Sequence, residues 1–192
     1  MVKKTGKKWI EIPKFVNIAA ILVTVAAMFA AVCWITSGKA GGEASDRKTA
    51  ALGFMMLRLE SATEASTSRV QAQSYLTQAG MYFAYAEKEE NSETKSALEN
   101  LGYQSLVASN LYISAAENAE NRAGLYYSGY EEALSSAVTW GKVADYRSTG
   151  ALIFNVSATL ASLGILLKRK EVLYVYIPIF AIGLFYFIMS FL

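Results

Sequence analysis

Three apolar stretches, at residues 15–36, 149–167 and 172–192, constrain the fold of this chain more than any other feature of its sequence. An α-helix crosses the hydrocarbon core of a bilayer with about 20 consecutive apolar residues, and each stretch has about that length. Only residues 168–171 separate the last two stretches, so we expect them to form an antiparallel hairpin. The sequence therefore predicts an all-α membrane protein with three transmembrane helices.

The composition agrees with a membrane protein and argues against an enzyme. Charged residues make up 18% of the chain, against about 25% in soluble domains. Histidine, the commonest general base and transition-metal ligand, does not occur in the sequence. The one cysteine, Cys33, excludes an intrachain disulfide and a cysteine-cluster metal site. Since we also find no phosphate-binding, dinucleotide-binding, hydrolase or zinc motif, we expect no catalysis, cofactor or metal ion.

The distribution of charge predicts the orientation in the membrane. The short segments 1–14 and 168–171 have a net charge of +6, whereas the rest of the chain has a net charge of −4. By the positive-inside rule, both short segments are cytoplasmic, and residues 37–148 and the C-terminus are extracytoplasmic. The expected location is the plasma or inner membrane. Anionic lipid headgroups account for the basic clusters without nucleic acid.

A cleaved signal peptide is the alternative interpretation of the first apolar stretch. Its basic start and its alanines fit that interpretation. Its length exceeds the usual apolar core of a signal peptide, and no clean Ala-x-Ala site precedes Gly38. We therefore favour a retained transmembrane helix.

The segment 37–148 lacks proline and is rich in alanine, leucine, serine and glutamate, which predicts long helices. The segment leaves and re-enters the membrane on one side, so the number of helices is even. We favour two long helices that reverse within residues 89–94. Four shorter helices are the alternative, with additional turns near residues 63–68 and 118–124.

Two local boundaries are expected in this segment. Ser92 follows the polar stretch and is a candidate cap of the second helix. Three glycines after the first apolar stretch predict a flexible exit from the membrane. These glycines are Gly38, Gly41 and Gly42.

Small and apolar residues recur at steps of three and four along the second predicted helix. Residues at that spacing form one stripe on a supercoiled helix. We predict that this stripe is a main contact surface. Part of it would pack against the first predicted helix of segment 37–148, and the rest would contact a second copy of the chain or other membrane subunits. It comprises Leu98, Leu101, Ala108, Tyr112, Ala115, Ala119, Tyr126, Tyr130, Ala133, Ala137 and Trp140. A looser stripe on the first helix comprises Leu52, Met55, Leu59, Ala62, Ser66, Val70, Gln73, Leu76, Gly80 and Phe83.

Two groups of polar residues are candidate sites, but each is better explained by structure than by ligand binding. Four glutamates near the reversal lack the ligand spacing and the glycine of a calcium loop, so a solvated hairpin tip is favoured. They are Glu87, Glu89, Glu90 and Glu93. The uncharged polar residues of the second span lie among small residues, which favours packing between membrane helices. The predicted packing residues are Asn155, Ala158, Ala161 and Ser162.

The sequence from Ala123 onward resembles an uncharacterised prokaryotic membrane family, the domain-of-unknown-function 4337 family. The resemblance is carried by Asp145-Tyr146-Arg147 before a span, by Leu160-Ala161-Ser162-Leu163 and by the Lys/Arg turn before a closing span. A weaker likeness covers residues 71–88. The resemblance implies a similar topology and no site residue, because the family has no known activity.

The sequence favours a non-catalytic accessory or scaffold subunit of a membrane assembly. A receptor-like sensor is a second hypothesis, because two spans flank an outer helical segment. It lacks a cytoplasmic signalling domain after the second span, where only residues 168–171 precede the next apolar stretch. A small oligomeric channel is a third hypothesis, and the lack of charged residues within the spans argues against it.

Overall fold

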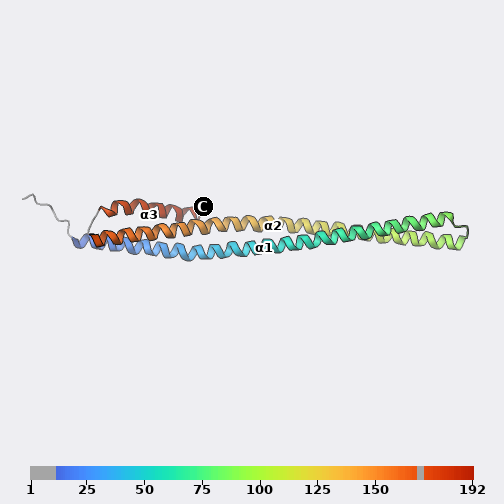
Figure 1. Ribbon diagram of the computed structural model, residues 1–192, viewed down its shortest axis with the longest axis horizontal. Helices are drawn as coiled ribbons and strands as arrows, with labels where there is room; N and C mark the ends of the chain where they lie inside the picture. The colour runs from blue at the N-terminus through green and yellow to red at the C-terminus, as the bar shows by residue number, and fades with distance from the viewer. Residues whose placement is uncertain (1–11, 168–170) are drawn as a thin grey trace, which may run out of the picture. The chain divides into compact units, whose positions relative to one another are not determined.

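The computed structural model describes residues 12–167 and 171–192. Within these ranges the chain forms α1 (Ile12–Lys88), α2 (Ser92–Leu167) and α3 (Val172–Met189), and it contains no β-strand (Figure 1). The all-α prediction is therefore confirmed. Most of the predicted basic N-terminal segment, and residues 168–170 of the predicted basic turn, lie outside the described residues.

Helix α1 runs without a break through the first apolar stretch and onward to Lys88. The predicted flexible exit is wrong, because Gly38, Gly41 and Gly42 are all helical. Each glycine costs roughly 1 kcal/mol relative to alanine in a helix. Flanking alanines and the packing of Ala40 and Ala44, both buried, outweigh that cost.

The chain reverses between Lys88 and Ser92, inside the predicted range, and two long helices are present in place of four short ones. The cap of α2 is Asn91, not Ser92 as predicted. The Asn91 Oδ1 atom accepts hydrogen bonds from the backbone amides of Glu93, at 3.0 Å, and Thr94, at 3.2 Å. Its carboxamide thus satisfies two amides that a new helix leaves unpaired.

Two helical segments are long and apolar enough, by length and composition, to cross a membrane: Val16–Lys88 and Ser92–Leu167. The apolar segment Tyr174–Met189 of α3 is shorter. Inside the apolar stretches, hydroxyl groups bond to carbonyl oxygens one turn earlier, such as Thr24 to Ala20 at 3.0 Å and Thr159 to Asn155 at 2.9 Å. These bonds satisfy polar groups without water, which suits an apolar environment.

The chain divides into two compact units. The terminal unit consists of Met1–Arg47 and Ser135–Leu192, and the hairpin unit consists of Lys48–Leu134. In the hairpin unit, α1 and α2 lie side by side and antiparallel, as Figure 1 shows. In the terminal unit, α3 packs against both long helices.

The core of the terminal unit is small residues surrounded by aromatic rings. Buried Ala30, Cys33 and Ala151 pack with Phe154. The ring of Phe29 lies 5.2 Å from that of Phe154, centroid to centroid, and further rings from α3 complete the cluster. Those rings belong to Phe180 and Phe187.

Candidate contact surfaces

The buried face of α2 follows an unbroken seven-residue repeat. Every residue of this face is buried or half-buried, and alanine, serine or glycine occupies most positions. One position of the repeat holds Leu98, Ser105, Tyr112, Ala119, Tyr126, Ala133 and Trp140. The other holds Gly102, Ser109, Ala116, Ala123, Tyr130, Ala137 and Ala144. A repeat of this kind is typical of helices that supercoil around each other.

The structure places part of this face one residue later than the sequence predicts. Leu101 is 42% exposed, and Ala108 and Ala115 are only half-buried. Their neighbours Gly102, Ser109 and Ala116 are buried in their place. The remaining predicted stripe residues, from Leu98 through Tyr112 and Ala119 to Trp140, do lie on the buried face.

Small residues enter the contact between α1 and α2 whether or not they are apolar. A Cβ atom on Gly102 would lie 2.7 Å from the ring of Phe83, so only glycine fits beneath that ring as it stands. The Ser109 hydroxyl donates a hydrogen bond to the Ala72 carbonyl oxygen at 2.9 Å, across the two helices. The predicted stripe contains neither residue, because it passes through Leu101 and Ala108 at these levels.

Helix α1 has two distinct faces in the hairpin unit. The face against α2 holds Ala51, Phe54, Arg58, Ser61, Ala65, Ser68, Ala72, Tyr75 and Ala79, all buried or half-buried. The ring of Tyr75 stacks on that of Tyr112 at 5.5 Å. The looser stripe predicted from the sequence is mostly a different face, because Leu52, Met55 and Leu59 are exposed. We call Leu52, Met55, Leu59 and Ala62 the outer stripe.

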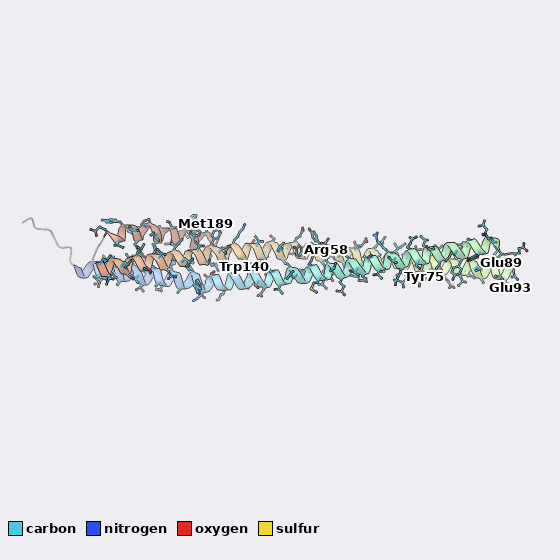
Figure 2. The ribbon with its side chains drawn as sticks, viewed as in Figure 1. Arg58, Tyr75, Glu89, Glu93, Trp140 and Met189 are labelled. Atoms are coloured by element: carbon cyan, nitrogen blue, oxygen red, sulfur yellow. The ribbon has the colours of Figure 1, made fainter. Side chains whose placement is uncertain are left out.

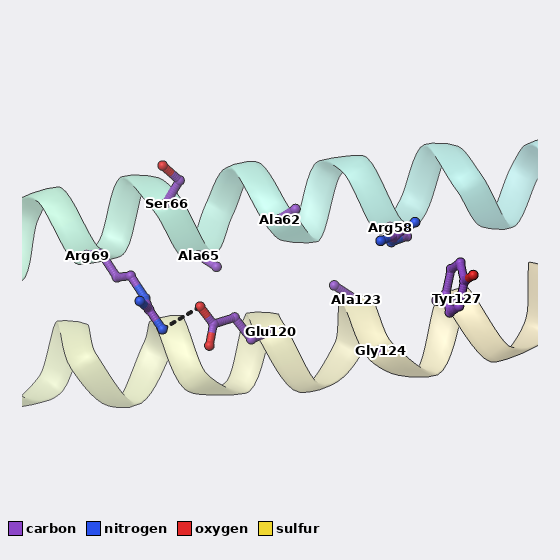
Figure 3. Close-up of a pocket in the computed structure, with 9 residues that line it drawn as sticks. All are labelled: Arg58, Ala62, Ala65, Ser66, Arg69, Glu120, Ala123, Gly124 and Tyr127. Carbon is purple, nitrogen blue, oxygen red and sulfur yellow. Dashed lines mark ion pairs between the residues drawn. The ribbon is translucent and has the colours of Figure 1, made fainter.

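A groove beside the outer stripe has a charged centre (Figure 3). Arg69 forms an ion pair with Glu120 at 2.6 Å, and the Arg58 guanidinium lies 4.4 Å from the centre of the Tyr127 ring. The Glu131 carboxylate accepts a hydrogen bond from the Tyr127 hydroxyl, which raises the pKa of Tyr127 above 10.0. Small side chains between these groups leave an open cavity of about 490 Å³. They belong to Ala62, Ser66, Ala123 and Gly124.

Arg147 connects all three helices of the terminal unit. From α2, its guanidinium donates hydrogen bonds to the Thr36 carbonyl oxygen of α1 and to the Ser190 hydroxyl after α3, both at 3.3 Å. It also lies 5.2 Å from the centre of the Phe191 ring. The sequence singles out Arg147 only as part of a family resemblance and predicts no structural role for it.

The predicted packing residues of the second span divide between two faces. Ala161 is fully buried, and Ala158 packs beside it. Asn155 and Ser162 are exposed. Tyr176, which is not among the predicted packing residues, is buried and donates a hydrogen bond to the Leu22 carbonyl oxygen at 3.1 Å.

The acidic residues at the reversal lie at the tip of the hairpin unit, where Figure 2 labels Glu89 and Glu93. Glu89 accepts a hydrogen bond from the backbone amide of Asn91 at 3.0 Å. Within the part of the chain that the structure describes, no group of three or more acidic, histidine or cysteine side chains is placed to hold a metal ion.

Comparison with known proteins gives no relative for this chain: no family model, no curated protein and no solved structure matches it. The resemblance to the domain-of-unknown-function 4337 family therefore stays a prediction.

Proposed function

We propose that the chain is a membrane-anchored accessory or scaffold subunit that acts through helix–helix contacts and carries out no catalysis. The observation that carries this proposal is the surface of the hairpin unit. Leu52, Leu59, Val107 and Leu111 are each exposed, although alanine, serine or glycine occupies most positions of the α1–α2 contact. Exposed large apolar side chains in this number support a role in contacts with other proteins.

The proposed membrane arrangement has three spans, contributed by the N-terminal part of α1, the C-terminal part of α2 and α3. The two long apolar helices support the first two spans. The net charge of +6 on the two short basic segments, against −4 elsewhere, supports a cytoplasmic N-terminus and an extracytoplasmic hairpin.

Purification from the native membrane in a mild detergent tests the proposed function. We expect the chain to elute as part of an assembly that contains other membrane subunits in a fixed ratio, established by native mass measurement. Elution of the chain with no other protein, under conditions that keep a known membrane complex intact, would contradict the proposal.

A further inference from the structure

We infer that a second copy of this chain docks on the groove and outer stripe of the hairpin unit, so that two hairpins form a four-helix bundle. This inference rests on the proposed membrane function and adds the identity of one partner and its contact surface. The groove is continuous along one side of the unit. Three adjoining hollows form it, and they share Arg58, Ala62 and Arg69 between them.

Apolar side chains are exposed at both ends of the groove, where a second copy would cover them. At one end, Leu52, Met55 and Leu59 of the outer stripe are exposed, and Leu59 reaches 69% exposure. At the other end, Leu76 of α1 and Ile113 of α2 are exposed. The small residues at the centre would let a neighbouring helix approach closely, as in antiparallel bundles.

The charges of the groove make it complementary to itself. The charged side chains that α1 contributes to its lining are Arg58 and Arg69, and those that α2 contributes are Glu117 and Glu120. One wall is therefore basic and the other acidic. A two-fold axis along the groove places the basic wall of each copy against the acidic wall of the other. The same pair of contacts therefore forms twice, as in any isologous interface. Arg69 and Glu120 lie at the same level, since they pair at 2.6 Å within one chain.

The membrane anchor selects this arrangement over an inverted one. Both ends of the hairpin unit continue into the apolar segments, so two copies in one membrane present their turns in the same direction. A two-fold axis along the hairpin keeps that direction and makes α1 of each copy antiparallel to α2 of the other.

A matched pair of leucine substitutions in the full chain tests the inference. Leu59, in the outer stripe, is 69% exposed, and Leu125, outside the groove lining, is 71% exposed. We expect the wild-type chain and Leu125→Glu to contain two copies in detergent, and Leu59→Glu to contain one, by native mass measurement. Far-UV circular dichroism of all three should agree, because neither side chain is buried. A single copy of wild type, a persistent dimer of Leu59→Glu, or dissociation of both variants would overturn the inference.

Cross-linking in membranes gives an independent readout. In a Cys33→Ser background, Ser66→Cys lies in the groove lining and Thr67→Cys lies outside it. We expect a bismaleimide to join two copies through position 66 much faster than through position 67, and equal rates would contradict the inference. A wild-type single copy bound to a different subunit would overturn the second-copy docking but support the proposed function. A dimer without other subunits would support the second-copy docking but contradict the proposed function.

Discussion

At the residue scale, the register of the α1–α2 contact depends on single small side chains. Ala116 is buried and Ala115 is half-buried, although they are adjacent and identical. We expect Ala116→Leu to force the helices apart and to lower the free energy of unfolding by about 1–3 kcal/mol. Ala115→Leu should change it by less than about 0.5 kcal/mol. Thermal unfolding followed by circular dichroism measures both, and an equal loss would contradict the register.

A second prediction at this scale concerns the ionisation of Tyr127. Its hydrogen bond to Glu131 favours the protonated phenol, so its pKa is raised in the folded chain. The resulting stabilisation is present below the unfolded pKa and is lost as pH rises through the folded pKa. We expect Glu131→Gln to shift one tyrosine of the tyrosinate absorbance titration to lower pH. Glu132→Gln, at the neighbouring carboxylate, should leave the titration unchanged, and identical curves for both variants would show that Glu131 has no such role.

At the scale of the element, the start of α2 depends on Asn91. Asn91→Ala removes the acceptor for the amides of Glu93 and Thr94, and should cost about 1 kcal/mol. Ser92→Ala should cost little, because no hydrogen bond from Ser92 caps the helix. Hydrogen exchange of the first-turn amides distinguishes the variants. Faster exchange of these amides in Ser92→Ala than in Asn91→Ala would show that Ser92 caps the helix, as the sequence predicted.

The attachment of α3 depends on Arg147. Arg147→Ala removes hydrogen bonds to the Thr36 carbonyl oxygen and the Ser190 hydroxyl, which should weaken the packing of α3 by about 1–2 kcal/mol. We expect faster hydrogen exchange in the last turn of α3, while the middle of α2 stays protected. Lys142→Ala, at an exposed position of the same helix, is the control. Unchanged exchange in Arg147→Ala would show that the other contacts of α3 suffice.

At the scale of the whole molecule, the sequence predicts the helical class and the reversal, because both follow from local chemistry. A run without proline permits long helices, and the polar residues 89–91 interrupt them. The contact register is harder to predict, because Gly102 and Ser109 enter a buried face through their size and through one hydrogen bond to the facing helix. The role of Arg147 depends on residues more than 40 positions away in the chain, which no local pattern reveals.

We propose that α1, α2 and α3 anchor the chain in a membrane and that the hairpin unit lies outside the cytoplasm. Single cysteines at Ser92→Cys and Lys170→Cys, in a Cys33→Ser background, test it directly with a membrane-impermeant thiol reagent. Position 92 begins α2 at the reversal, and position 170 belongs to the basic turn predicted from the sequence. In intact cells, we predict that Ser92→Cys reacts and that Lys170→Cys reacts only after the membrane is permeabilised. Labelling of Lys170→Cys but not Ser92→Cys in intact cells would contradict the account.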